Sequence, residues 1–402
     1  MKLSKEKIII ILTILIDVIG IGIVIPVMPF FVQSLGASAI TITSLFAVFA
    51  LCSFISSPLL GSLSDKFGRR PALITSLAST AIGWFFFASA HNIIILFIGR
   101  IIDGLAAGNF TIAQSYMADM SKNDKERTAN MGMIGAIFGL GFIIGPIIGA
   151  VLSNISMAFP FWFVGALATL NTIAAMIFLP ETNKDLHRDK KISIHPFTPI
   201  KAAIEDKFLR PRYLILFLFS LAFTVQQSVF ALYTQEAFNF TVASTSYLMT
   251  AMGLIMVINQ GFLLKNFWLK KFTEAKLEVW LVLVIAMSFI FMSFASIYIF
   301  MSGIFVMMLC QSVLRAVMSS RITGFSDPRK KGEVAGIMSS MMTLGMIIGP
   351  LVIGYIYIIN HRLPFIISGI VLFIAFIVAY ASRHKIPEKK FHHEEVTPIE
   401  TI

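Results

Sequence analysis

The stretch GSLSDKFGRRPAL at residues 61–73 places four charged side chains within six residues, between two long apolar runs. The four are Asp65, Lys66, Arg69 and Arg70. No further lysine, arginine, aspartate or glutamate follows until Arg100. Charged side chains are costly in hydrocarbon and collect where helices leave it, so such a corner is typical of a short loop at a membrane surface. The stretch therefore predicts a membrane crossing on each of its two sides.

The composition of the whole chain agrees with this reading. Of its 402 residues, 57% are hydrophobic and only 13% are charged, and the mean hydropathy is +0.85. Soluble domains carry about 25% charged residues, and a globule in water could not hide so much apolar surface. The two cysteines, Cys52 and Cys310, lie inside apolar runs and indicate neither a disulfide framework nor a metal site. We expect an all-α integral membrane protein.

Twelve apolar runs are each long enough to span, given that a membrane helix needs about 20 mostly apolar residues. They lie near residues 8–31, 39–60, 71–90, 94–117, 129–152, 159–180, 213–235, 244–264, 277–294, 298–320, 334–358 and 363–382. The first run is too long for the core of a signal peptide, contains Asp17 and lacks a cleavage site. It is interpreted as a retained first helix.

The basic residues predict the orientation of these helices. If the N-terminus is cytoplasmic, every lysine and arginine except Arg100, Arg315 and Arg362 falls on the cytoplasmic side. This positive-inside bias predicts a multi-pass protein of the cell (inner) membrane with both termini in the cytoplasm. The net charge of +11 is thus a topology signal, for which anionic lipid headgroups are the natural partner, and nucleic acid is not expected as a partner.

A motif repeats half a chain apart. LGFIIGPIIG at residues 140–149 is followed by LGMIIGPLVIG at residues 344–354. Repeats at this spacing are typical of carriers built from two similar bundles that hold the substrate near the bilayer midplane. The predicted parts are a six-helix bundle at 1–180, a cytoplasmic linker at 181–212, a second six-helix bundle at 213–382 and a cytoplasmic tail at 383–402.

The charged corner also resembles a known family signature. Its pattern resembles the motif between helices two and three of the major facilitator superfamily, and the residues that carry it are Gly61, Leu63, Asp65, Gly68, Arg69 and Arg70. The resemblance implies a twelve-helix carrier in which this corner helps to latch the two halves on the cytoplasmic side. The alternative is a loop that only anchors its helices by positive charge, which would not require the aspartate or the glycines.

Two further motifs are similar to one branch of that family, the drug–proton antiporters. One, on the fifth run, comprises Gly141, Gly145, Pro146 and Gly149. The other, IDVIGIGIVIPVMP, begins just before Asp17 and resembles the first helix of tetracycline-type and multidrug exporters. The glycines let two helix backbones approach closely, and Pro146 favours a kink. Generic close packing is the alternative to a bending element.

Three charged side chains lie within the first and fourth runs. By helical rise, Asp17 lies about 15 Å and Asp103 about 14 Å from opposite faces of a core about 30 Å thick, with Arg100 about a turn further out. We expect Asp17, Arg100 and Asp103 to share a proton-coupling site, since burial disfavours a charged carboxylate and a guanidinium favours it. The alternative is a self-neutralised Arg100–Asp103 pair. In the family that this chain resembles, the arginine of helix four is most often followed three residues later by Gln and then Gly. This chain departs from that pattern by having Asp103 in the place of the glutamine.

The second half of the chain offers amides rather than deep acids. The substrate-binding candidates are Gln114, Gln226, Gln227, Phe230, Asn259 and Gln311. Some of the amides are expected to line a cavity and others to join helices. The 38 phenylalanines and 21 methionines suit a permissive pocket. Arg315 lies about 9 Å from Arg321 by helical rise, and snorkelling to the surface is its favoured interpretation.

These features predict a monomeric, proton-coupled exporter of amphiphilic, drug-like or tetracycline-like compounds, with the proton gradient as energy source and no cofactor. Two alternatives remain: a carrier of the same fold for a native metabolite or lipid, and a membrane receptor that transports nothing. An enzyme is not expected, because neither zinc-ligand spacing, nor a nucleophile elbow, nor a P-loop is present. The export direction follows from the resemblance alone, and the substrate is not specified.

Overall fold

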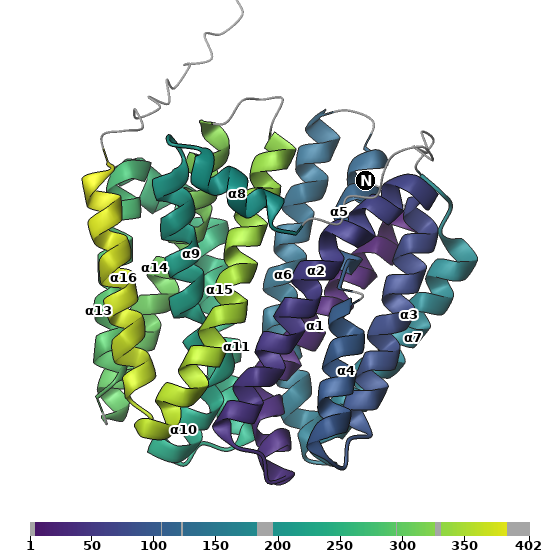
Figure 1. Ribbon diagram of the computed structural model, residues 1–402, viewed down its shortest axis with the longest axis horizontal. Helices are drawn as coiled ribbons and strands as arrows, with labels where there is room; N and C mark the ends of the chain where they lie inside the picture. The colour runs from purple at the N-terminus through teal and green to yellow at the C-terminus, as the bar shows by residue number, and fades with distance from the viewer. Residues whose placement is uncertain are drawn as a thin grey trace, which may run out of the picture.

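The computed structural model places nearly all of the chain in long helices that run roughly along one direction (Figure 1). It describes residues 5–105, 107–121, 124–182, 196–294, 296–325 and 331–383. Much of the predicted linker, at 183–195, and the predicted tail from 384 onward lie outside these residues. The described part of the chain contains no strand. The all-α fold predicted from composition is confirmed.

The first part of the chain forms seven helices. They are α1 (Lys5–Ser34), α2 (Ala39–Phe67), α3 (Arg69–Ala88), α4 (Ile93–Leu105), α5 (Asn109–Asp119), α6 (Asp124–Ser153) and α7 (Phe159–Phe178). The rest forms α8 (Thr198–Glu205), α9 (Arg210–Ser228), α10 (Phe230–Phe238), α11 (Val242–Ile258), a π-helix (Asn259–Trp268), α12 (Leu269–Lys271), α13 (Glu274–Met292), α14 (Ile297–Gly324), α15 (Lys331–Ile359) and α16 (Leu363–Ala381). Within the described ranges, eleven helices are long and apolar enough to cross a membrane, or twelve when α9 and α10 count as one span.

Three predicted spans are not continuous α-helices. The run at 94–117 is divided into α4 and α5, with Gly104 and Gly108 on either side of the break, and glycine weakens a helix interior. The run at 213–235 bends by 50° between α9 and α10. The run at 244–264 passes from α11 into the π-helix. The expectation of single unbroken helices was wrong at these places, because apolar content predicts length but not local breaks.

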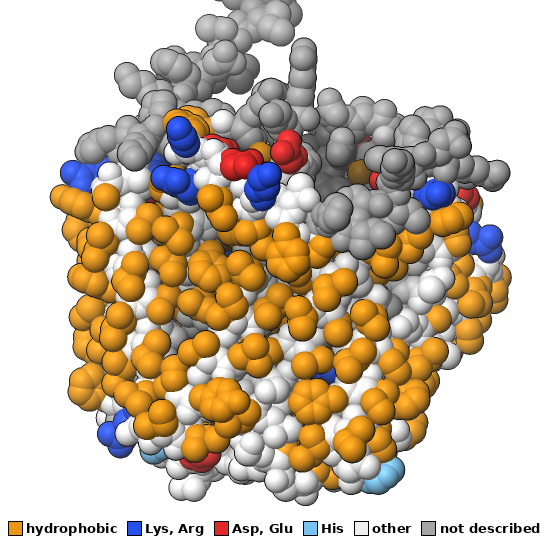
Figure 2. All heavy atoms as spheres, in the orientation of Figure 1, with side chains coloured by type: hydrophobic (Ala, Val, Ile, Leu, Met, Phe, Trp, Pro, Cys, Tyr) orange, Lys and Arg blue, Asp and Glu red, His pale blue; other side chains and the backbone are white. Residues whose placement is uncertain are grey.

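Both ends of the described chain lie at one end of the bundle, which we call the terminal end; the other is the distal end (Figure 1). Figure 2 shows apolar side chains covering the flank between them, while most of the visible charge lies near the two ends. The exposed apolar residues belong to many different helices. An apolar belt bounded by two charged rims is the surface that a bilayer requires.

The repeated glycine motifs make matching contacts in the two parts of the chain. On α6, a Cβ added to Gly141 would meet Val18 of α1, and one added to Gly145 would meet the backbone of Gly22. On α15, a Cβ added to Gly349 would meet Thr224 of α9. The small residues therefore allow α6 to lie close against α1, and α15 against α9. Helix α6 runs through Pro146 without interruption.

Helices from the two repeats also pack on one another. The pairs α2–α15 and α6–α11 join the first part of the chain to the second. A Cβ added to Gly354 of α15 would meet Thr43 of α2, near the distal end. Thr250 of α11 donates its hydroxyl to the carbonyl of Ile143 on α6, at 3.5 Å. The division into two six-helix domains stays a prediction.

Candidate functional site

A polar cluster lies inside the span region of α1, α3, α4 and α5. The amide nitrogen of Asn109, at the start of α5, donates to Asp17 Oδ1 at 3.2 Å and to Thr80 Oγ1 at 3.1 Å. The Thr80 side chain also lies close to the Asp103 carboxyl. Asn109 and Asp103 are buried, whereas Asp17 is partly exposed. Asn109 and Thr80 therefore lie between the two acids.

Arg100 lies in the same cluster, where it contacts one acid, a thioether and aromatic rings. Its Nη1 is 3.6 Å from Asp103 Oδ2, and its Nη2 donates to the Met28 sulfur at 3.2 Å. The guanidinium carbon is 4.7 Å from the centre of the Phe87 ring and 5.1 Å from that of Trp84. Aromatic faces stabilise a desolvated cation. Arg100 is thus held by Asp103 and the rings together.

The structure brings Asp17, Arg100 and Asp103 into one cluster, as their predicted depths require. Asp103 faces the Arg100 guanidinium, and the two acids are close enough to interact electrostatically. When both acids are ionised the three groups carry one net negative charge, and neutral Asn109 and Thr80 do not cancel it. The role of the cluster in proton coupling stays a prediction.

Sequence reasoning did not assign Asn109 and Thr80 to this site. Asn109 begins α5 only because the fourth run breaks before it, and the predicted helix was continuous. Thr80 lies on α3, where a lone threonine among apolar residues carries no signal of its own. Both enter the site through contacts between residues far apart in sequence.

The charged corner is held by ion pairs and by a helix cap. Arg69 Nη1 lies 2.7 Å from Asp65 Oδ1, and Arg69 Nε lies 3.1 Å from Asp119 Oδ2. The Glu181 carboxylate accepts from the backbone N–H groups of Arg69 and Arg70, at 2.9 and 3.0 Å. A carboxylate at a helix N-terminus is stabilised by the helix dipole. Each of these contacts joins residues between 65 and 181, in the first part of the chain, and the latch between halves stays a prediction.

The two glycines of the corner have different roles. Gly68 has a φ of 109°, between α2 and α3, and a Cβ there would collide with the Glu181 carboxylate. Gly61 instead lies within α2, with open space around it. Gly61 therefore does not lie in the turn between the two helices, because α2 continues to Phe67.

Gly68→Ala is expected to destabilise the protein. A non-glycine residue at this φ costs on the order of 1–3 kcal/mol, and the added methyl displaces Glu181 from the α3 terminus. Thermal unfolding of the purified protein in detergent measures the effect. Gly61→Ala is the matched control and should melt like the native protein or slightly higher, since alanine favours a helix. Equal melting of both variants would contradict this account of the corner.

The substrate-binding candidates lie in different surroundings. Gln226 and Gln311 are buried, and their Oε1 atoms have no hydrogen-bond partner. Gln114 and Gln227 are partly exposed. Asn259 is buried and fully engaged: its Nδ2 donates to Leu309 O and Ser312 Oγ, and its Oδ1 accepts from Trp268. Their role in substrate binding is untested.

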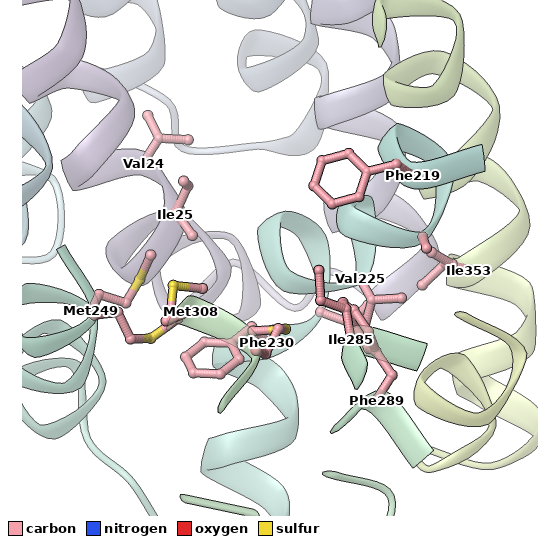
Figure 3. Close-up of a cluster of buried hydrophobic side chains, with 14 of the residues drawn as sticks. Val24, Ile25, Phe219, Val225, Phe230, Met249, Ile285, Phe289, Met308 and Ile353 are labelled. Carbon is pink, nitrogen blue, oxygen red and sulfur yellow. The ribbon is translucent and has the colours of Figure 1, made fainter. Parts of the chain in front are cut away.

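An apolar cluster joins α1 to the second part of the chain (Figure 3). Val24 and Ile25 of α1 lie near Phe230, Met249 and Met308, which come from α10, α11 and α14. All five side chains are buried. Phe230 also stacks on Phe300, with ring centres 6.0 Å apart. Of the binding candidates, Phe230 thus belongs to the contact that closes the distal half of the interior.

A second buried charge cluster ties together four helices at the terminal end. Glu278 of α13 accepts through Oε2 from Arg321 Nη1 of α14, and Arg212 Nε of α9 lies 3.4 Å from the same oxygen. Arg212 Nη1 also donates to the carbonyl and hydroxyl oxygens of Ser382, at 3.1 and 2.6 Å. One acid therefore pairs with two arginines, which leaves one net positive charge, and all three side chains are buried.

A cavity of about 410 Å³ opens at the distal end, where α2, α10 and α15 meet. Its lining includes Ala39, Glu236, Tyr357 and His361, and the Tyr357 hydroxyl donates to Glu236 Oε2 at 2.8 Å. Among the described residues, no group of three or more His, Cys, Asp or Glu side chains could hold a metal ion.

Comparison with known proteins gives concordant results along the chain. The family model described as Major Facilitator Superfamily matches residues 10–274 and 261–401. The quinolone resistance protein NorA of Staphylococcus aureus is 28% identical over 391 residues, which cover 95% of this chain and 98% of that protein. The class C tetracycline resistance protein of Escherichia coli is 26% identical, covering 89% and 91% of the two chains. Multidrug resistance protein 2 of Bacillus subtilis is 27% identical, covering 93% and 94%.

Solved structures share the fold. The human organic anion transporter MFSD10 superposes with a TM-score of 0.69 at 21% identity, covering 93% of this chain and 99% of that one. The nucleoside transporter NupG superposes with a TM-score of 0.78 at 13% identity, covering 94% and 99%.

Proposed function

Because this chain belongs to the major facilitator superfamily, we propose that it is a proton-coupled exporter of amphiphilic, drug-like molecules that works by alternating access. The names of its relatives support the cargo class, since they confer resistance to quinolones, to tetracycline and to several drugs. A permissive cargo also fits an interior rich in methionine and phenylalanine, whose side chains adapt to different shapes.

The observation that carries the proposal is the environment of the Asp17 carboxyl group. It is a carboxyl group inside a span, and its described hydrogen-bond partner is the neutral amide of Asn109. Arg100 lies against Asp103 instead. An acid at membrane depth without a counter-ion is costly and by default marks function. Protonation removes that charge, and Asn109 and Thr80 lie between Asp17 and Asp103, so the two acids can share the proton load.

The proposed orientation places the terminal end in the cytoplasm. Positive charge gathers in the segments at that end, as the positive-inside rule requires. Both termini are then cytoplasmic in a cell (inner) membrane protein, and the protein acts as a monomer whose cavity lies between its two halves. Its partners are the lipid bilayer, protons and a small-molecule cargo.

Transport into inside-out vesicles tests the proposal. A lipophilic cationic or tetracycline-like dye should accumulate in vesicles that contain the protein when the lumen is acidic. Collapse of the pH gradient by a protonophore should abolish the accumulation. Vesicles without the protein control for passive partition of the dye. Accumulation that persists without a gradient would refute proton coupling, and no accumulation with any dye of this class would refute export of drug-like cargo.

A further inference from the structure

Arg315 of α14 lies nine residues before the end of that helix at Gly324, about 14 Å by helical rise, and its side chain is exposed. Tyr298 and Phe305, the most exposed apolar side chains of α14, lie about 90° away around the helix. Arg315 therefore lies on a different face of α14 from these apolar residues, and its snorkelling to the membrane surface stays a prediction.

The face of α14 that carries Arg315 is buried in its distal part and exposed toward the terminal end. Ile304, Met308 and Gln311 occupy its distal part and are 2%, 5% and 4% exposed. Met308 belongs there to the apolar contact with α1 (Figure 3). One turn further toward the terminal end, Arg315 and Ser319 of the same face are exposed. The side chains of this face are thus buried as far as Gln311 and exposed beyond it, toward the terminal end.

Helix α1 shows the same change on the opposite wall. Val24 and Met28 are buried, whereas Ile21 is 39% exposed and Asp17, one turn further, is partly exposed. All four lie on one helical face. On both helices the side chains of this face therefore become exposed toward the terminal end, with a carboxyl group on α1 and a guanidinium on α14.

Arg315 has no counter-ion within the described part of the chain. No ion pair, hydrogen bond or ring contact joins it to a described residue, in contrast to Arg100, Arg212 and Arg321. An arginine at membrane depth is costly unless an anion or water accompanies it. Its planar fork binds a carboxylate through two parallel hydrogen bonds. The missing partner is thus best supplied by the cargo.

We propose that Arg315 binds an anionic group of the cargo, and that this exporter prefers zwitterionic amphiphiles with a carboxylate over purely cationic ones. The inference rests on the proposed function and names the cargo class. Asp17 on the opposite wall attracts the cationic group of the same molecule, and the apolar side chains between the walls hold its rings. Arg315 then sets specificity, while proton coupling stays with the acids of the first part of the chain.

The test compares rhodamine B, which carries a free carboxylate, with its ethyl ester, which does not. Their binding to the purified protein in lipid nanodiscs is measured by fluorescence polarisation, without a pH gradient. The native protein should bind the zwitterion more tightly than the ester. Arg315→Gln should weaken binding of the zwitterion about tenfold, or 1.4 kcal/mol, and leave the ester unaffected. Arg315→Lys should retain part of the preference, because lysine keeps the charge but not the fork.

Arg362→Gln is the control, since that arginine is exposed at the distal end. Retained binding of the ester shows that the Arg315 variant is folded. An equal loss for both dyes, or no change for either, would overturn the inference. So would failure of the native protein to bind rhodamine B. Because binding needs no gradient, a failure of proton-driven transport refutes the proposed function without producing any of these outcomes.

Discussion

Asp17→Asn is expected to abolish accumulation of cargo driven by a pH gradient while leaving cargo binding largely intact. If one proton is exchanged for each cargo molecule, a pH difference of one unit across the membrane supplies about 1.4 kcal/mol. That free energy sustains a tenfold concentration ratio of the cargo. Asparagine has nearly the shape of aspartate and remains next to Asn109, but it cannot bind and release a proton. Without the coupled proton, the carrier can only equilibrate its cargo across the membrane.

Gradient-driven uptake and equilibrium binding of the same dye, measured in parallel, separate coupling from recognition. Glu205→Gln is the control, because Glu205 lies on α8 in an exposed pair with Lys201 at 3.8 Å, and exposed pairs contribute little. Undiminished accumulation by the Asp17 variant would remove Asp17 from the mechanism. Loss of both binding and accumulation would indicate that Asp17 acts mainly on the cargo.

Asp103→Asn should behave differently from Asp17→Asn. Asp103 is the described carboxylate partner of Arg100, whose other contacts are a thioether and aromatic rings. Removing it leaves a buried guanidinium without a counter-ion, which is costly. We therefore expect a lower melting temperature in detergent for Asp103→Asn than for Asp17→Asn. Equal melting of the two variants would show that the rings alone suffice to hold Arg100.

Glu278→Gln is expected to have the largest effect on folding. Glu278 is 0% exposed, and its Oε2 serves both Arg321 and Arg212. Glutamine leaves two buried arginines without a described acid partner, and breaking a buried pair costs about 3–5 kcal/mol. The ends of α9, α13 and α14 meet at this point. The variant should give little monodisperse protein and a strongly lowered melting temperature.

Glu274→Gln is the matched control. Glu274 lies one turn earlier on α13, is partly exposed and accepts from Ser320 at 2.8 Å, so its loss should change little. The double variant Glu278→Gln, Arg321→Gln should regain part of the stability, because it restores the native net charge of the cluster. Native-like melting of Glu278→Gln alone would show that solvent reaches these arginines.

The fold was largely predictable from the amino-acid sequence because each span satisfies the bilayer on its own. The transfer of an apolar segment depends on its own side chains, so all twelve runs coincide with helices of the structure. The role of the glycine motifs was equally predictable, since Gly141 and Gly145 let helices approach closely by having no side chain. What remained hidden was the division of the fourth run before Asn109, where the distribution of apolar residues shows no change.

The candidate site was predictable only in part. The cost of burying charge identified Asp17, Arg100 and Asp103 without any structure, and their depths placed them at similar levels. Thr80 and Glu181 could not be identified from the cost of burying a charge. Thr80 is neutral, and Glu181 lies near a membrane surface. Their roles arise from partners on other helices.

The sequence by itself thus determined which segments are long and apolar enough to cross a membrane, where small residues let helices meet, and which charged residues lie within those segments. These properties are local, since each residue pays its own cost of transfer into lipid. Only the tertiary structure decided that Glu181 caps α3, that Glu278 holds two arginines, and that Arg315 has no counter-ion among the described residues. Those outcomes depend on how each helix is rotated against its neighbours, and that rotation is set by packing between residues distant in sequence.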